Sequence, residues 1–184
     1  MREGVVMDLA QYRAMFSTIT VPGFITHIRI HLDEAVALWM LKRFGHHVFK
    51  SVADLKYAFV SQNIEPPYGR TVEEYARAGA IVVGCWGSPL DEHGGTSKNG
   101  VKRERKKGES ATSLTLKFLD LEDDEILKNL SDEVRENDTN GRARILELSL
   151  MIRVMEDAGW SDEEVLRWVF QFFDAYYDSQ TRFF

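Results

Sequence analysis

The residues of this chain best suited to chemistry are two histidines and an aspartate close together near the N-terminus. His27, His31 and Asp33 fall within seven residues, in the spacing H-x-x-x-H-x-D. Imidazole nitrogens together with a carboxylate oxygen suit divalent Mn, Fe, Co, Ni or Zn better than Ca or Mg. The spacing therefore predicts a binding site for a divalent metal.

Two predicted elements position these residues. Residues 24–30 mix aromatic and β-branched side chains, which is typical of a buried strand. Apolar residues then recur at helical spacing over 32–44, and Gly45 ends that helix. The histidines thus lie where a strand gives way to a helix, which is where open α/β sheets bind ligands.

Strand geometry indicates how these side chains would share one pocket. Alternate residues of a strand face the same side, so we expect His27, Arg29 and His31 to point together. Asp33 lies at the start of the helix and can bend back toward them. The charges of Asp33 and Glu34 would also complement the helix dipole, and that structural role explains the acidic pair equally well.

The rest of the chain predicts an α/β fold in which a parallel sheet is flanked by helices. Further strands are expected at 57–60 and 80–84, with a short helix over 71–77 between them. Thr71 and Glu74 have the spacing of a capping box for that helix. The C-terminal half is helix-rich, with helices expected over 110–119, 123–136, 142–158 and 161–177. Amphipathic helices must bury an apolar face, so we expect them to cover the sheet.

Two further groups of ligand-type residues occur in predicted loops. Asp91, Glu92 and His93 follow the strand that ends near Gly84, and Asp138 lies between two helices. Each group also has an ordinary structural role. The first would be an exposed turn, and Asp138 would form an Asx turn or a helix N-cap. Both alternatives stay open at the level of the sequence.

Length, charge and cysteine content limit the class of protein. The chain has 184 residues, which suits one domain. Its formal charge of −6 argues against a molecule that binds polyanions over its whole surface. A single cysteine excludes an intramolecular disulfide. No apolar run is long enough to span a bilayer, and the N-terminus lacks a signal-peptide pattern. We therefore expect a cytoplasmic protein with no membrane partner.

Taken together, the motifs resemble those of the DHH phosphoesterase superfamily, and within it the melanocyte-proliferating-gene-type family of proposed metal-dependent exonucleases. Four blocks occur in the family's order over most of the chain. The first block is Thr26-His27 with Ile30-His31 and Asp33-Glu34, and the second is Asp91-Glu92-His93, where the family has Asp-His-His. The third is the start of a helix in small residues, Ser110-Ala111-Thr112-Ser113-Leu114. The fourth is Asp138-Thr139-Asn140-Gly141, where the family has Asp-Asn-Gly.

The resemblance implies a phosphoesterase that hydrolyses a phosphodiester or phosphate ester with metal-activated water. The implied cofactor is a divalent metal, Mn first, with Mg, Co, Fe or Zn as alternatives. The implied metal ligands are His27, His31, Asp33, Asp91, Glu92 and Asp138. His93 would contact the substrate phosphate or act as general acid, and Arg29 would neutralise phosphate charge. The implied substrates are phosphate-containing small molecules, nucleotides among them, or short single-stranded nucleic acid.

The chain departs from the family pattern in two respects. The family has an aspartate at the end of the strand before the Asp-His-His loop, where it bridges two metals, whereas residues 82–87 contain no carboxylate. We also expect residues 1–184 to form the phosphoesterase domain alone, without the second domain that closes over the site in the superfamily. A second hypothesis is therefore a relative that binds metal or nucleotide without turnover.

Two other segments suggest partners. The basic stretch at 98–107 would be a lid over the substrate or an ordinary surface excursion, and both interpretations stay open. The C-terminal helix carries aromatic residues at helical spacing, which is typical of a core or a dimer interface. We expect a homo-oligomer formed through this helix. A helical interaction module is the third function that the sequence allows.

Overall fold

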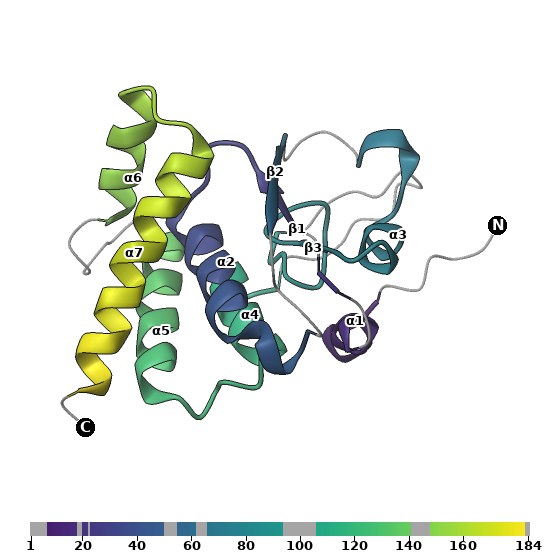
Figure 1. Ribbon diagram of the computed structural model, residues 1–184, viewed down its shortest axis with the longest axis horizontal. Helices are drawn as coiled ribbons and strands as arrows, with labels where there is room; N and C mark the ends of the chain where they lie inside the picture. Colours follow the sequence, from purple (N-terminus) through teal and green to yellow (C-terminus); the bar gives the residue numbers. More distant parts are fainter. Residues whose placement is uncertain are drawn as a thin grey trace.

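The protein is described by a computed structural model in which helices surround a small sheet (Figure 1). The described residues are 7–17, 20–21, 23–49, 55–61, 66–93, 106–140 and 148–182, without the side chains of 138–140. The elements in chain order are α1 (Leu9–Phe16), β1 (Gly23–His27), α2 (Leu32–Phe44), β2 (Lys56–Val60), α3 (Val72–Arg77), β3 (Ala80–Val82), α4 (Ala111–Phe118), α5 (Glu125–Asn140), α6 (Leu148–Asp157) and α7 (Asp162–Thr181).

Strand β1 lies at the centre of a three-stranded sheet with the order β2-β1-β3. Both neighbours run parallel to β1, and Ile25 is aligned with Ala58 on one side and with Val82 on the other. Parallel neighbours need crossover connections, which α2 and α3 provide. The predicted α/β fold with a parallel sheet is confirmed. Because the strands are parallel, the loops that follow them gather at one edge of the sheet.

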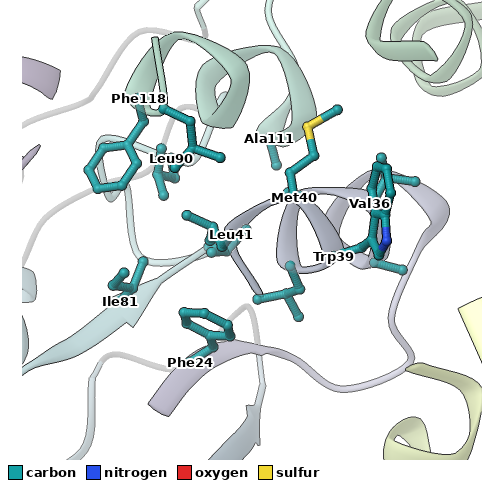
Figure 2. Close-up of a cluster of buried hydrophobic side chains, with 14 of the residues drawn as sticks. Phe24, Val36, Trp39, Met40, Leu41, Ile81, Leu90, Ala111 and Phe118 are labelled. Carbon is teal, nitrogen blue, oxygen red and sulfur yellow. The ribbon is translucent and has the colours of Figure 1, made fainter. Parts of the chain in front are cut away.

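Helix α2 forms the centre of the hydrophobic core. Its residues Leu32–Leu41 are all buried, which is the pattern of a helix covered on every side. Figure 2 shows Leu41 in one cluster with Phe24 and Ile81 of the sheet and Phe118 of α4. The first turn of α2 is thereby fixed relative to the ends of the strands.

The opposite flank of α2 packs against α7, which supplies the aromatic residues of the C-terminal half. The rings of Trp39 and Phe173 have centroids 5.4 Å apart, and the indole N–H of Trp39 donates to Asp174 at 2.9 Å. Phe170 and Phe173 are buried, so at least these two aromatic residues belong to the core. Phe183 and Phe184, which the sequence grouped with them, lie outside the described residues.

The other side of the sheet is covered by α3, with α1 beside it (Figure 1). Ile25, Val82 and Cys85 form a small apolar cluster there, packed against Tyr75 of α3. The hydroxyl of Tyr12 in α1 accepts the N–H of Val82 at 2.8 Å. This bond satisfies a backbone donor on β3, a strand with no neighbour on its outer side in the described sheet.

The predicted elements differ from the structure mainly at their ends. The strand expected over 24–30 stops at His27, because Arg29 adopts a left-handed backbone conformation with φ 56°. The expected loop around Asp138 is instead part of α5, which continues to Asn140. Helix α1 was not predicted at all. Among the described residues, no helix has both the length and the apolar character needed to cross a membrane.

Candidate metal centre

The candidate centre lies where β1 and β3 end, at the edge of the sheet where parallel α/β folds bind ligands. After β1 the chain turns through Arg29 into α2. After β3 it turns through Gly84 and Trp86, with φ values of 65° and 58°. Left-handed conformations are costly for residues with a side chain, and such outliers gather at functional sites. Arg29 and Trp86 are both such outliers, and each lies in a loop that carries ligand-type side chains.

The first group of ligand-type side chains consists of His27, His31 and Glu34. One ligand atom from each lies within 4.8 Å of the others. His27 and Glu34 are buried, and His31 is exposed. The Nε2 atom of His27 is 3.1 Å from Oε1 of Glu34. The group therefore has a buried base of one imidazole and one carboxylate, with a second imidazole on the solvent side.

The orientation of His27 leaves Nε2 as its ligand atom. Nδ1 lies 2.9 Å from the carbonyl oxygen of Ile28, which can only accept, so Nδ1 carries a proton. Burial alone lowers the pKa of His27, but the facing carboxylate of Glu34 raises it more, to about 9. Without a metal at neutral pH, His27 is thus a cation paired with Glu34. A metal at Nε2 would replace that proton.

The second group consists of Asp91, Glu92 and His93, in the loop after β3. Here too one ligand atom from each lies within 4.8 Å of the others. Nδ1 of His93 is 2.8 Å from Oε1 of Glu92 and 3.3 Å from Oδ1 of Asp91. The two carboxylates raise the pKa of His93 to about 10, against the lowering effect of burial. Both carboxylates are buried, while the His93 side chain is 38% exposed.

Gly84 connects the two groups. Its N–H donates to the carbonyl oxygen of Leu90 at 2.9 Å, which fixes the loop that carries Asp91. A Cβ atom at position 84 would lie 2.5 Å from Cγ and 2.8 Å from Oε1 of Glu34. The carboxylate of Glu34 thus occupies the space in front of the end of β3. This is the strand end at which the family pattern has an aspartate and this chain has none.

Asp33 makes backbone contacts that the sequence did not predict. Its two carboxylate oxygens accept the backbone N–H groups of Ala111 at 2.6 Å and Thr112 at 2.9 Å. The Thr112 hydroxyl in turn donates to the backbone oxygen of Asp33. Burial, together with the charges of Glu34 and Glu92, raises the pKa of Asp33 to about 7, against the bonds from Thr112. Asp33 therefore ties the start of α2 to the N-terminus of α4, where an acidic group is favourable.

Two buried carboxylate oxygens in this region, Oε2 of Glu34 and Oε2 of Glu92, have neither a hydrogen bond nor an ion pair among the described residues. Buried polar groups in proteins are nearly always paired, and buried carboxylates need a compensating charge. Four carboxylates are buried here, at Asp33, Glu34, Asp91 and Glu92. The donor set and its two unpartnered oxygens are of a kind that could hold a metal ion.

The structure brings together five of the residues predicted from the sequence: His27, His31, Asp91, Glu92 and His93. Arg29 points elsewhere and forms ion pairs with Glu156 and Asp157. Asp138 lies within α5 rather than in a loop, and its side chain is outside the described part of the chain.

Sequence reasoning missed Glu34, which it treated as a charge near the start of a helix. The signal that identifies it is the missing side chain at Gly84, against which Glu34 packs.

The basic stretch at 98–107 is described only from Lys106 onward. The ammonium group of Lys106 donates to the carbonyl oxygens of Ser88, Pro89 and Asp91, at 3.4, 2.8 and 3.0 Å. Lys106 therefore holds the loop of the second group in place. The remaining basic residues, 98–105, lie outside the described residues.

Comparisons of the chain with protein-family models, with curated proteins and with solved structures gave no match. The resemblance to DHH phosphoesterases therefore remains a prediction from the motifs.

Proposed function

We propose that this protein is a metal-dependent phosphoesterase whose centre is formed by the His27 and His93 groups. The observation that carries the proposal is the convergence of buried carboxylates with imidazoles at the ends of two parallel strands, where one carboxylate oxygen of Glu34 and one of Glu92 have no partner among the described residues. The ordered motif blocks point to a phosphoester substrate. One such group alone would be compatible with a structural ion pair, but two adjacent groups of this composition at one sheet edge favour a metal centre.

The two ligand groups would have different roles in the proposed reaction. His27, Glu34 and His31 would hold a divalent ion at the end of β1, and Asp91, Glu92 and His93 offer ligands at the end of β3. Bound there, the ion would polarise the phosphoryl group and lower the pKa of the attacking water. The partly exposed His31 and His93 are the members of these groups that substrate can reach.

Glu34 would take the place of the aspartate that the family pattern has at the end of this strand and that this chain lacks. Its Oε1 faces His27, and its Oε2 is buried without a partner among the described residues. Because Glu34 packs directly against Gly84, its carboxylate lies on the side of the first group that faces the loop of the second. A carboxylate in this place is suited to act as the shared ligand of a two-metal site.

The second candidate function, binding without turnover, is favoured by Asp33. Both of its carboxylate oxygens are already committed to backbone amides of α4. Both oxygens of Asp91 likewise accept backbone N–H groups, from Gly87 and His93, so two of the implied carboxylate ligands already have hydrogen-bond partners. Metal retention and hydrolysis must be measured separately, because the two candidate functions differ only in the second.

The test uses the full chain incubated with Mn²⁺, freed of excess metal and analysed for metal content by mass spectrometry. We expect about one or two ions per chain and hydrolysis of bis(p-nitrophenyl) phosphate. His31→Ala should abolish hydrolysis, because it removes a metal ligand. Since the side chain is exposed, the substitution should cost the fold little, and the loss can be assigned to the site. His46→Ala, which removes an exposed histidine just beyond the end of α2, is the matched control. Bound Mn without hydrolysis would favour the binding protein, and absence of Mn from a folded chain would refute both candidates.

A further inference from the structure

A separate cavity of about 690 Å³ lies outside the two ligand groups. It opens between the loop after β1, the end of β2 and the turn that joins α6 to α7. Figure 1 shows the loop from β1 to α2 passing beside the start of α7, and the N–H of Ile30 donates to Asp162 across this contact at 3.1 Å. The lining residues used below are Arg29, Phe59, Glu156, Asp157, Trp160 and Asp162.

The charges around the cavity are unbalanced. Glu156, Asp157, Asp162 and Glu163 contribute four carboxylates to the lining, against the single guanidinium of Arg29. An anion such as a phosphate or a nucleic-acid strand would be repelled here. A positively charged group would be attracted.

Glu156 has one carboxylate oxygen without a hydrogen-bond partner among the described residues. Its side chain is only 9% exposed, yet its Oε1 has no hydrogen-bond partner among the described residues. Its Oε2 lies 3.5 Å from Nε of Arg29, a long contact for an ion pair. The Glu156 side chain lines the cavity, so an N–H donor bound there would pair with this carboxylate once the side chain rotates toward it.

Aromatic side chains complete the lining. Trp160 is 45% exposed although it is large and apolar, and Phe59 lines the cavity from β2. Flat aromatic faces attract organic cations, and tryptophan does so most strongly. A buried carboxylate beside an accessible indole suits an organic cation that also has an apolar part.

Arg29 gives an internal example of the chemistry that fits. Its guanidinium donates to Asp157 at 3.2 Å and lies near Glu156, yet its side chain is 70% exposed. The cavity wall therefore already accepts a guanidinium from the chain itself, held loosely at its rim. A ligand with the same group would extend the pairing to the unpartnered oxygen of Glu156.

We propose that this cavity binds an organic cation with N–H donors, of the guanidinium or primary-amine class, between Glu156 and Trp160. No member of the His27 or His93 groups takes part, so binding does not require a metal. The proposal goes beyond phosphoesterase activity and stands or falls independently of it.

The test titrates the metal-free full chain with agmatine, which carries both a guanidinium and an amine, and measures heat by calorimetry. Butylurea serves as the neutral analogue with similar planar N–H groups, and methyl phosphate as the anion. We expect saturable binding of agmatine and at least about tenfold weaker binding of both controls, because a charged partner strengthens each hydrogen bond. Equal binding of butylurea, or no saturable binding of agmatine, would overturn the proposal.

Four variants locate the bound cation. Glu156→Gln keeps the shape of the side chain and should weaken agmatine about tenfold, and Trp160→Ala should weaken it about threefold or more. Glu122→Gln removes an exposed carboxylate elsewhere and should change nothing. Arg29→Gly suits the left-handed backbone and removes the competing guanidinium, so binding should tighten.

Circular dichroism checks the fold of each variant. Trp160→Ala alters an exposed side chain, and it decides the question if Glu156→Gln does not fold. Unchanged affinity in both folded variants would refute the assigned site.

Discussion

The centre at the ends of β1 and β3 and the cavity beside the α6–α7 turn are both rich in carboxylates, but they differ in burial and in partners. At the centre, Glu34 and Glu92 are almost completely buried and each faces an imidazole. At the cavity, Asp157 is largely exposed and the nearest base is a loosely held arginine. An acidic sequence motif therefore does not by itself say which kind of cation a site will bind.

The difference follows from the ligand atoms that each region leaves unpaired. Imidazole nitrogens and carboxylate oxygens that converge within a few ångströms suit a small, bare metal ion. A wide cavity with one buried carboxylate oxygen and an indole suits a large cation that keeps its own N–H donors. The two regions adjoin, since His31 of the centre is close enough to lower the pKa of Glu156 against the larger, raising effect of burial.

The largest expected effect separates the two regions by reciprocal substitutions. Glu34→Gln should lower Mn affinity about 100-fold or more, as loss of a ligand costs at least as much as loss of a supporting group, and should leave agmatine binding unchanged. Glu156→Gln should weaken agmatine binding about tenfold and leave Mn affinity unchanged. Equilibrium dialysis with Mn²⁺ and calorimetry with agmatine measure the two affinities on the same preparations. If Glu34→Gln weakened both ligands equally in a folded chain, the two regions would be one site.

The next prediction tests the contact between Glu34 and Gly84. Gly84→Ala forces a left-handed alanine and brings its Cβ to 2.5 Å from Cγ of Glu34. The first effect alone costs about 1–2 kcal/mol, and displacement of a buried carboxylate adds about 1–3 kcal/mol. Urea unfolding in the presence of chelator measures the sum.

Gly108→Ala is the matched control for that substitution. Gly108 has φ +78°, and a Cβ atom added there would have no described neighbour within 4 Å, so it reports the backbone cost alone. An equal loss of stability in the two variants would show that Glu34 does not press against Gly84, and Mn binding should fall only in Gly84→Ala.

A third prediction concerns pH, because the centre contains a buried histidine and the described lining of the cavity does not. The pKa of His27 is raised from 6.5 to about 9 in the folded, metal-free protein. The folded state therefore holds this proton more tightly than the unfolded chain does. The resulting stability is complete below pH 6.5 and is lost as the pH rises through about 9, by up to about 3 kcal/mol.

Unfolding free energies at pH 6 and pH 9.5 in chelator test this slope. His27→Gln should reduce the slope to the part that His93 contributes, because the pKa of His93 is also raised, to about 10. His46→Gln, which removes an exposed histidine, should leave the slope intact. An unchanged slope in His27→Gln would assign the titration to other groups and remove the evidence that His27 and Glu34 form an ion pair.

The sequence predicted the elements better than the contacts between them. Periodicity and capping signals correctly located α2, α3 and α7, and the alternation of strands and helices correctly predicted a parallel sheet. Helix α1 was missed, although Asp8 and Gln11 form a capping box at its start. Its first turn lacks a strong apolar period, and what holds the helix is long-range: Tyr12 and Phe16 are buried in the core, and the N–H of Val82 donates to Tyr12.

In the candidate site too, the sequence predicted local neighbours better than long-range contacts. His27 and His31 are neighbours, as predicted, but a short turn brings them together rather than the strand alternation that we expected, because β1 ends at His27. Local spacing could not decide which of Asp33 and Glu34 faces the histidines, because adjacent residues at the start of a helix point in different directions. The choice depends on a long-range contact, since Asp33 accepts the N–H of Ala111 in α4, 78 residues further along the chain. Arg29 was misplaced for a similar reason, because its left-handed backbone turns it toward carboxylates on α6.

The smallest expected effect tests how firmly the second ligand group is held, compared with the first. The first group lies on a strand and a helix, whereas the second depends on a loop fastened by Lys106 through three carbonyl oxygens. Lys106→Met should therefore cost about 1–2 kcal/mol of stability and weaken Mn binding about tenfold or less at the second group. Lys107→Met, an exposed neighbour, is the control for lost charge. If both variants bound Mn like the unaltered chain, the Asp91 loop would be held without Lys106, and the two groups would be equally rigid supports for metal.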